Sequence, residues 1–561
     1  MRISKLGLPL IAAFSLACGG NEPEPQPPVS PPVPKAVVDA GPPPSAANVK
    51  VRILAFNDFH GNLKPPTNKL PKMDQPVGGA SYFAAHLKKL AEGHPNTLVV
   101  AAGDLIGASP LTSGLFHDEP TIEVMNAIGL TASTIGNHEL DEGPDELLRM
   151  KKGGCHPKDG CKFEKDFPGA KFDYLAANVS VKASSSTLFP PYVVREVAGI
   201  PIAIVGMPLE DTPHSVVPEG VAGLEFGNED KVANALVPDL KKKGIETMIL
   251  LIHEGGETKS PGLDDCYELK GSIVGIVEKL DPAYDAVVSG HTHQLYNCKV
   301  AGRPVTSASS FGRVITTIDL EIDPKTKDVV KAEAHNHAVT QDVAPDPTVQ
   351  GIVDKAIAAA APIENRVIGK ITDTLSGGSR NGQESTLGRV VADAQLEATK
   401  KTAKAQVAIV NAAGIRSDIV FARSGDEKED GLVTYGEAFA AQPFGNKLYT
   451  MTVTGEELAK TIERELRGAG LYVSEGLVVK WDRDSKEPPK LTLNGKPVAP
   501  AQKIRLTTNN FVADRDPGLA KITDRTPGPV DLDALEAYFA AKKVVSPPKT
   551  SRLQTHRDAN K

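Results

Sequence analysis

The sequence has little of what marks a membrane-spanning or nucleic-acid-binding protein. After residue 17, no segment reaches the roughly 20 consecutive apolar residues that a transmembrane helix requires. The 63 basic and 70 acidic residues give a formal charge of −7 and are spread along the chain without blocks. We therefore expect neither a nucleic-acid polymer nor an anionic membrane surface among the partners of this protein.

Cysteine is scarce, with five residues in 561, and no two of them form a C-x-x-C pair, which argues against zinc coordination by cysteine. Four of them, Cys155, Cys161, Cys266 and Cys298, form an even set that suits an oxidising compartment. They allow three disulfide connectivities, and four reduced thiols are the alternative. We favour Cys155–Cys161, because CHPKDGC is a short polar loop able to close on itself, and Cys266–Cys298 as the remaining pair.

The N-terminus has the pattern of an export signal. Residues 1–17 carry two basic side chains, then an apolar run, then Ala17. The following SLACGG segment resembles a bacterial lipobox, in which the cysteine after the cleavage site receives a lipid. We expect an exported protein, periplasmic or at the cell surface, whose membrane contact is a lipid anchor on Cys18.

Composition and periodicity divide the remaining chain into five segments. They are a proline-rich extended tether (18–48), a first α/β domain (49–340), a connector helix (341–368), a second α/β domain (369–545) and a tail without a pattern (546–561). We expect the connector helix to break at Pro362. In the second domain we predict a helix over 386–400, a strand over 405–410 and a capping box from Thr454 to Glu457.

Each predicted strand of the first domain ends in residues that can bind a metal. These are Asn57-Asp58-Phe59-His60-Gly61 after 51–56, Gly103-Asp104 after 97–102, Asn137-His138-Glu139 after 133–136, His253 after 247–252, and Gly290-His291-Thr292-His293 after 285–289. A single such Asp or His is ordinarily a turn or surface residue, but five clusters in one domain are not explained that way. In layered α/β folds ligands gather at the carboxyl ends of strands, so we expect one shared cleft.

The residue types indicate the chemistry of this cleft. Imidazole and carboxylate ligands suit zinc, manganese or similar divalent ions, and a shared carboxylate can bridge two of them. Two such cations neutralise a phosphate and activate water, so the pattern predicts phosphoester hydrolysis. The other histidines have no comparable neighbours in sequence and are expected to be solvated: His86, His94, His117, His156, His214, His335, His337 and His556.

The order N-D-x-H-G, G-D, G-N-H-E, a strand-terminal H and G-H-T-H resembles that of the calcineurin-like metallophosphoesterases. The specific likeness is to the bacterial periplasmic 5′-nucleotidase and UDP-sugar hydrolase branch, over about residues 50–545. It implies a four-layer metallophosphoesterase β-sandwich flanked by helices, followed by a second α/β domain that binds the substrate. It also implies two divalent metal ions, one held by Asp58, His60, Asp104 and His293 and the other by Asp104, Asn137, His253 and His291, with Asp104 as the bridge.

The same resemblance leaves no metal position for His138. We expect His138 to face the phosphate of the substrate and to stabilise or protonate the leaving oxygen. Asp141, three residues on, would orient it by a hydrogen bond. Glu139 has the identity usual in the family, but no role is assigned to it.

In the second domain, N-A-A-G-I-R (411–416) and P-F-G-N (443–446) resemble the family's N-x-G-G-I-R and P-F-G-N motifs of the nucleotide pocket, with Ala413 in place of a usual glycine. Arg416 would clamp the phosphate. Phe444 and Phe511 would stack on either side of the nucleobase, the alternative being ordinary core phenylalanines. The remaining predicted pocket residues are Arg380, Asn411, Gly414, Asn446 and Asp516. The segment VADRDPG after Phe511 departs from the family's G-G-D-G-Y.

The leading hypothesis is therefore an exported 5′-nucleotidase, with UDP-sugar hydrolysis as an additional activity. The same metal site would serve a 2′,3′-cyclic-nucleotide phosphodiesterase, a sugar-nucleotide pyrophosphatase or a thiosulfohydrolase. A different class, a surface-binding lipoprotein that lost catalysis, is disfavoured by the complete ligand set and the His138–Asp141 pair.

Overall fold

The computed structural model describes residues 47–66, 69–259, 262–378, 384–423, 427–484 and 487–556. The predicted export signal, Cys18, most of the tether and Arg380 lie outside the described residues. None of the helices within the described ranges combines the length and apolar character needed to span a bilayer.

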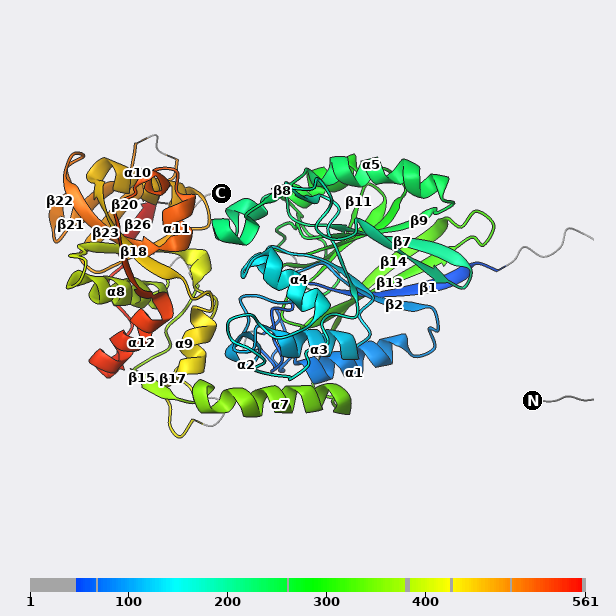
Figure 1. Cartoon of the computed structure of the whole chain (residues 1–561), viewed down its shortest axis with the longest axis horizontal. Helices are drawn as coiled ribbons and strands as arrows, with labels where there is room; N and C mark the ends of the chain where they lie inside the picture. The colour runs from blue at the N-terminus through cyan, green and yellow to red at the C-terminus, as the bar shows by residue number, and fades with distance from the viewer. Residues whose placement is uncertain are drawn as a thin grey trace, which may run out of the picture. The chain divides into compact units, whose positions relative to one another are not determined.

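Two six-stranded sheets form the centre of the first domain (Figure 1). The first has the order β14 (Val329–Ala338), β13 (Val314–Ile322), β1 (Val49–Phe56), β2 (Thr97–Ala101), β3 (Ala132–Thr134) and β4 (Asp173–Leu175). The second has the order β11 (Leu295–Val300), β12 (Arg303–Ala308), β10 (Tyr284–Ser289), β9 (Thr247–Ile252), β7 (Ile200–Met207) and β6 (Tyr192–Val197). Buried aliphatic side chains such as Ile53, Ile202 and Ile249 belong to one core that joins the two sheets.

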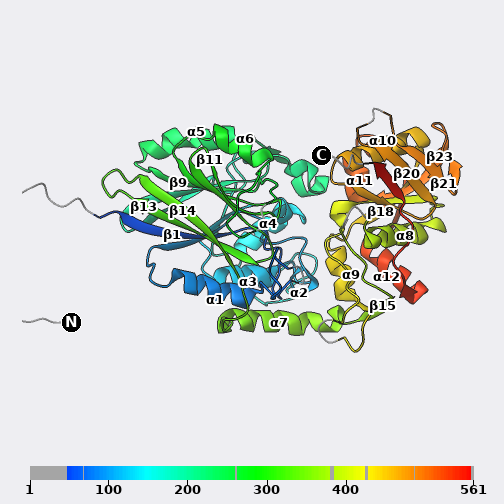
Figure 2. The same cartoon turned by 180° about the vertical axis from the view of Figure 1, so that it is seen from behind.

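Helices cover both outer faces of this sandwich (Figure 2). On the first sheet lie α1 (Ala80–Ala91), α3 (Glu119–Ala127), α4 (Pro144–Lys152) and α7 (Pro347–Glu364), and on the second lie α5 (Glu229–Lys242) and α6 (Ser272–Lys279). Shorter elements are α2 (Leu111–Gly114), the 3₁₀ turns η1 (His138–Leu140), η2 (Thr212–His214) and η3 (Pro218–Val221), and the paired strands β5 (Val179–Val181) and β8 (Leu224–Phe226). The predicted helix–sheet–sheet–helix architecture is confirmed.

The connector helix differs from its prediction in its bounds and at its proline. Strand β15 (Val367–Ile371) begins within the predicted range, and the helix spans Pro347–Glu364 rather than 341–368. It is continuous through Pro362 and ends at Glu364 rather than breaking at the proline. Only two helical residues follow Pro362, so the loss of one amide donor near the end of the helix is tolerated. At the other end, the side chain of Asp346 caps the helix by accepting hydrogen bonds from two backbone amides.

The second domain is also α/β. Its sheets are β19 (Leu471–Val473), β16 (Val407–Asn411), β23 (Lys503–Asn509), β18 (Lys447–Thr454) and β24 (Arg525–Val530); β17 (Leu432–Thr434), β15 (Val367–Ile371) and β25 (Val544–Val545); and β22 (Lys496–Pro497), β21 (Lys490–Leu493), β20 (Leu477–Asp482) and β26 (Leu553–His556). Its helices are α8 (Thr386–Lys400), α9 (Tyr435–Ala441), α10 (Gly455–Arg467), α11 (Asn510–Arg515) and α12 (Asp531–Lys542), with the 3₁₀ turns η4 (Ala412–Gly414) and η5 (Leu519–Lys521). The predicted helix over 386–400 and the Thr454–Glu457 capping box are confirmed.

The tail, in which the sequence shows no pattern, contains a strand. Strand β26 pairs in parallel with β20. The preceding Arg552 is buried and donates two hydrogen bonds to the carboxylate of Asp393 on α8, at 2.7 and 2.8 Å. This ion pair joins residues 159 positions apart, so no local sequence pattern predicts it. It attaches the tail to the second domain. The exact boundaries of the two domains stay a prediction.

The structure contains both disulfides that the sequence favoured. Cys155 is bonded to Cys161, and Cys266 to Cys298, with Cα atoms 4.6 and 5.0 Å apart. The first closes a loop directly after α4, and the second joins the loop 262–271 to β11. Disulfides of this kind form in oxidising compartments.

Candidate dinuclear metal centre

The carboxyl ends of the parallel strands bring the predicted metal ligands together. Asp58, His60 and His293 form one group and Asp104, His253 and His291 a second, and the ligand atoms within each group lie within 4.8 Å of one another. Asp58, His60, Asp104 and His253 are almost completely buried. Parallel strands place these side chains at one edge because β1 pairs with β2, and β9 with β10, in the same direction.

Asp104 lies between the two groups. Its Oδ2 is 3.0 Å from Nε2 of His253 and 3.6 Å from Nε2 of His60. Asn137 completes the second group, because its Oδ1 lies 3.2 Å from Nε2 of His253 and 3.0 Å from Nδ1 of His291. One carboxylate is therefore within reach of ligands from both groups.

Backbone carbonyls fix the orientation of two of these imidazoles. Nδ1 of His60 donates to the carbonyl of Gly107 at 2.8 Å, and Nδ1 of His253 donates to the carbonyl of Ala102 at 2.7 Å. Such bonds turn Nε2 of each ring towards the centre. Nε2 of His60 then faces Nε2 of His293 at 3.1 Å, an approach that needs a cation or a proton to be favourable. The donor set therefore fits the metal ions that this type of fold implies.

The electrostatics of the site also suit metal binding. Burial lowers the pKa of His60 and of His291 to about 3, so both are neutral and able to act as ligands at neutral pH. Burial opposes ionisation of Asp104, but the positive charge of His253 outweighs it and holds the pKa of Asp104 well below its usual range. Asp104 is consequently a carboxylate.

Five of the candidate ligands have left-handed backbone conformations. The φ angles are 50° at Asp58, 47° at His60, 50° at Asp104, 69° at His291 and 55° at His293. Aspartate and histidine enter this region more readily than most residues with a side chain, but the conformation is still unfavourable. Each strand therefore turns sharply where it ends, and the ligand side chain is directed into the centre.

Glu139 has a role that the sequence did not show. This buried carboxylate accepts hydrogen bonds from the backbone amides of Asp104 at 2.9 Å, Leu105 at 2.7 Å and Gly136 at 2.5 Å. It thereby fastens the loop after β2 to the loop after β3. The two loops are so close that a side-chain carbon at Gly136 would lie 2.1 Å from Oδ1 of Asp104. In the sequence, the G-N-H-E motif is the one signal that could have marked Glu139 as part of the site.

His138 and Asp141 form a pair beside the metal ligands. Nδ1 of His138 donates to Oδ2 of Asp141 at 2.8 Å, and its backbone amide donates to Oδ1 of Asp104 at 2.9 Å. Burial lowers the pKa of His138, but the charges of Asp141 and Asp104 outweigh this and raise the pKa above its usual value. A histidine that keeps its proton in this position can donate it.

Two residues of the predicted substrate pocket lie at this pair. The ring of Phe444 stacks on His138, with centroids 5.7 Å apart and planes 15° apart. The guanidinium of Arg416 lies 5.8 Å from the centre of the Phe444 ring. Asn411 and Gly414 belong to the segment that leads from β16 to Arg416. Oδ1 of Asn411 accepts a hydrogen bond from Asn509 at 3.0 Å.

The structure places the other predicted pocket residues in contacts within the second domain. The guanidinium of Arg515 lies 4.4 Å above the ring of Phe511. Arg464 donates two hydrogen bonds of 2.7 Å to the carboxylate of Asp516. Asn446 is buried, and its carbonyl accepts a hydrogen bond from the backbone amide of Asp531 at 2.8 Å. Their contacts to substrate stay predictions.

The expectation that the remaining histidines are all solvated is wrong for His86. This residue is buried on α1, and its Nε2 donates to the carbonyl of Thr340 at 2.9 Å. The sequence pattern missed it because the partner lies 254 positions along the chain.

Comparison with known proteins agrees with this geometry. Residues 51–295 match the profile of the calcineurin-like phosphoesterases, and residues 367–523 match that of the 5′-nucleotidase C-terminal domain. The chain is 32% identical to the endonuclease YhcR of Bacillus subtilis over 505 residues, which cover 88% of this chain and 40% of that protein. It is 29% identical to the cell wall protein Lmo0130 of Listeria monocytogenes over 504 residues, covering 83% of this chain and 64% of that protein.

The chain thus spans less than two thirds of either relative. The crystal structure of a 5′-nucleotidase precursor from Thermus thermophilus has the same fold, with a TM-score of 0.75 at 22% identity over 90% of this chain and 99% of that one. The two matched domains, in this order and above a shared set of buried histidines and aspartates, place the chain in the 5′-nucleotidase family of metallophosphoesterases.

Proposed function

We propose that the protein is an extracytoplasmic phosphohydrolase that uses two divalent metal ions to release phosphate from nucleoside 5′-phosphates. The observation that carries the proposal is the position of Asp104, whose Oδ2 lies within 3.6 Å of Nε2 of both His60 and His253. The first ion would be held by Asp58, His60, Asp104 and His293, and the second by Asp104, Asn137, His253 and His291. Zinc or manganese fits these nitrogen and oxygen donors.

When bound, two such ions neutralise the phosphate and make water a better nucleophile. The protein supplies the proton. Because Nδ1 of His138 is committed to Asp141, Nε2 is the atom available to donate a proton to the leaving oxygen. Asp141 keeps the imidazole in this orientation and stabilises its charge.

The second domain would bind the rest of the nucleotide. Arg416 is placed to contact the phosphate, because its electrostatic partners include Asp58, Asp104 and Asp141 of the first domain. Its planar guanidinium can donate two parallel hydrogen bonds to phosphate oxygens. Phe444 and Phe511 would stack on the base, and Arg380, Asn411, Gly414, Asn446 and Asp516 would line the remainder of the pocket.

A second candidate activity is cleavage of phosphodiesters. The identity to the endonuclease YhcR over 88% of this chain favours it. The same centre can act on a diester, so the substrate depends on the pocket rather than on the ligands. The even distribution of charge argues for the small nucleotide, since a nucleic-acid strand is ordinarily bound by a basic surface.

Activity of metal-stripped protein with zinc or manganese restored tests the proposal. We expect release of inorganic phosphate from AMP and, more weakly, products from UDP-glucose. Single-stranded DNA and 2′,3′-cyclic nucleotides serve as the diester substrates. Cleavage of the diesters with no phosphate released from AMP would reject nucleotide hydrolysis in favour of the second candidate, and no hydrolysis of any substrate would reject both.

Replacing Phe444 by alanine should separate binding of the base from chemistry. Stacking contributes about 1–3 kcal/mol per base, so KM for AMP should rise about 5- to 150-fold. KM for a phosphate ester without a ring, such as glycerol phosphate, should not change. Phe439→Ala on α9 is a control for loss of a partly buried ring of the same domain. An equal rise in KM for both esters would show that Phe444 does not hold the base.

The proposed location outside the cytoplasm rests on three observations. The sequence begins with the pattern of an export signal, the structure contains two disulfides, and one relative is a cell wall protein. Lipid attachment at Cys18 is part of the proposal and would be detected by the mass of the mature N-terminal peptide.

A further inference from the structure

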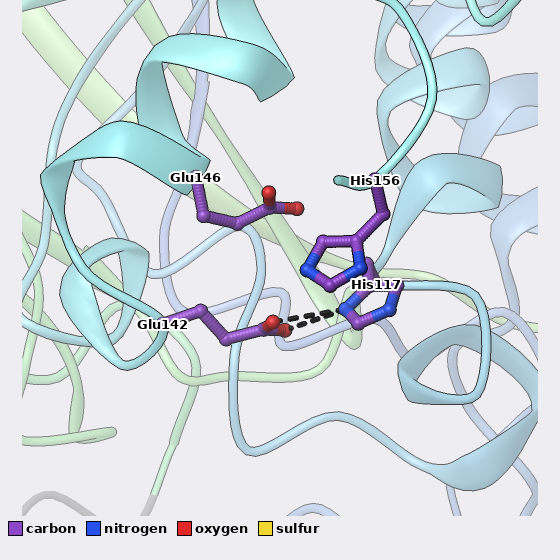
Figure 3. Close-up of side chains that lie close together, drawn as sticks. All are labelled: His117, Glu142, Glu146 and His156. Carbon is purple, nitrogen blue, oxygen red and sulfur yellow. Dashed lines mark hydrogen bonds and ion pairs between the residues drawn. The ribbon is translucent and has the colours of Figure 1, made fainter. Parts of the chain in front are cut away.

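A second group of metal-binding side chains lies apart from the dinuclear centre. His117, Glu142, Glu146 and His156 each present one ligand atom, and these atoms lie within 4.8 Å of one another (Figure 3). They come from three segments: the turn between α2 and α3, the stretch from η1 into α4, and the disulfide loop after α4. The four side chains converge on one point between these segments.

His117 has the hydrogen-bond pattern of a metal-binding imidazole. Its Nε2 donates to Oδ2 of Asp159 at 3.0 Å, and its Nδ1 lies 2.9 Å from Oε2 of Glu142. A carboxylate that accepts the N–H of one ring nitrogen leaves the other nitrogen free for a metal, as is common around zinc. Asp159 would thus orient His117, and Glu142 would be its neighbour in the coordination sphere.

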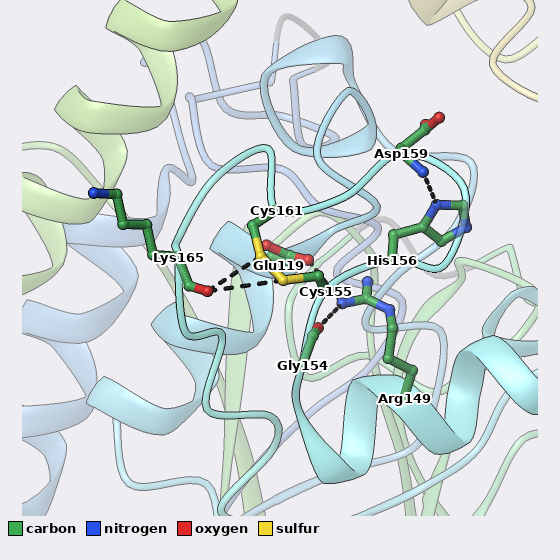
Figure 4. The surroundings of a disulfide bond; sticks show 8 residues. All are labelled: Glu119, Arg149, Gly154, Cys155, His156, Asp159, Cys161 and Lys165. Carbon is green, nitrogen blue, oxygen red and sulfur yellow. Dashed lines mark hydrogen bonds and ion pairs between the residues drawn. A yellow bond between two sulfur atoms is a disulfide. The ribbon is translucent and has the colours of Figure 1, made fainter.

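The disulfide and Arg149 hold the other two ligands, His156 and Glu146, in place, and Figure 4 shows the surroundings of His156. Cys155 and Cys161 close the short loop that carries both His156 and Asp159. Arg149 donates to the carbonyl of Gly154 at 2.6 Å, at the start of this loop. The same guanidinium binds Glu146, with Nε at 2.9 Å from Oε2 and Nη2 at 2.7 Å from Oε1. Hydrogen bonds of this kind fix the direction of a ligating carboxylate.

The simpler explanation is an ion pair, in which a protonated His117 lies between Glu142 and Asp159. That pair accounts for two of the contacts. It does not account for the ring of His156, which stacks on His117 with centroids 3.8 Å apart, or for Glu146, which faces the same point. In the structure, the backbone amide of Asp159 donates a hydrogen bond to Nδ1 of His156 at 3.1 Å. If Nε2 of His156 binds a metal ion, the ring proton moves to Nδ1. This hydrogen bond is then lost.

We propose that His117, Glu142, Glu146 and His156 form a third metal site, which binds a zinc-like divalent ion separately from the dinuclear centre. Two imidazoles and two carboxylates are a donor set that suits zinc, with tetrahedral geometry. The ion would link three segments that also pack together through buried side chains such as Phe116, Leu147 and Phe163. It would therefore stabilise the fold, by an amount that grows with the logarithm of the ion concentration once that exceeds the Kd.

Two of these segments continue directly into the dinuclear centre. Glu142 follows Asp141, the partner of His138. His117 precedes Asp118, whose Oδ2 accepts from the amide of Gly107 at 3.0 Å, while the carbonyl of Gly107 accepts from His60. The third site is thus suited to steadying the loops that carry catalytic and ligand residues.

Zinc content per chain tests the proposal. After saturation with zinc and dialysis, His156→Ala and Glu142→Gln should each hold one ion fewer than the parent, by elemental analysis. The rise in melting temperature on adding zinc should shrink in both variants. Asp159→Asn should keep the site but weaken zinc binding about 10- to 100-fold, because it loses only the orienting charge.

His214→Ala is the matched control. His214 is exposed and also pairs with a carboxylate, Asp211, at 2.6 Å, but within the described part of the chain it belongs to no group of three or more candidate ligands. This variant should hold as much zinc as the parent. Equal zinc content in the parent, His156→Ala and Glu142→Gln would overturn the proposal and leave the ion pair as the explanation. Loss of one ion in His214→Ala would also overturn it, because the extra ion would then be adventitious.

Discussion

Asp104→Ala should lose both metal ions of the centre and reduce phosphate release to the background rate. The reason is the position of Oδ2, which lies 3.0 Å from Nε2 of His253 and 3.6 Å from Nε2 of His60 and so can serve both ions. Removing this oxygen also leaves Asp58 as the one carboxylate among the proposed ligands to offset the charge of two cations. Elemental analysis and hydrolysis of AMP measure the two effects together.

His60→Ala is the comparison that makes this prediction specific. His60 belongs to the first group of ligands only, so its loss should mainly lower the content of one ion. A melting curve for each variant separates loss of metal from loss of fold. Near-full occupancy of both positions in Asp104→Ala would remove the bridging role of Asp104.

His138→Ala should keep its metal ions and yet lower kcat about 10²- to 10⁴-fold, the loss typical of a general acid or a positioning group. His138 has no ligand position in the centre, and its Nδ1 is bound to Asp141. The loss should be smaller for a substrate with a good leaving group, which needs no proton. Steady-state rates with AMP and with an aryl phosphate, at measured metal content, give the comparison.

Asp141→Asn should reduce kcat in the same direction but less, because the amide oxygen can still accept the Nδ1 hydrogen bond without stabilising the charge. If the His138→Ala protein loses an ion, His138 is a ligand and the proposed scheme is wrong. If the loss in kcat is the same for both leaving groups, His138 is not the acid.

The metal centre could be predicted because its residues follow a rule of topology. Asp58, Asp104, His253 and His291 each come within three residues of the end of a strand, and parallel strands bring their carboxyl ends to one edge. Periodicity located the strands, and the spacing of the clusters then followed. The division of these residues into two ligand sets, with Asp104 as the bridge, came instead from the resemblance to the calcineurin-like metallophosphoesterases.

Residues that act through the backbone could not be predicted in the same way. Glu139 binds three amide groups from two loops, and its partners become visible only once the loops are folded. Arg552 and Asp393 pair across 159 positions, so the tail was missed as a strand. His117 and His156 have no partner nearby in the sequence and were expected to be solvated. Two helices, a strand and a 3₁₀ turn separate them along the chain, although the fold stacks their rings.

The predicted nucleotide pocket is intermediate between these cases. Its motifs identified Arg416 and Phe444, which the structure places beside His138 and the aspartates. Asp516 and Phe511 come from a segment that departs from the family pattern. There the carboxylate is occupied by Arg464 and the ring by Arg515, two contacts that a motif comparison does not contain.

The left-handed backbone at five candidate ligands lowers the stability of the fold, while the side chains at these positions are the ones that the proposed catalysis requires. Glycine is the residue that adopts this conformation at least cost, and glycine offers no side chain to a metal. Aspartate or histidine there costs about 1–3 kcal/mol at each position. Selection for heat resistance alone would therefore favour glycine at these positions and produce a sturdier but inert protein. Improvements in thermal tolerance should accordingly be sought in the helical layers, away from the strand ends.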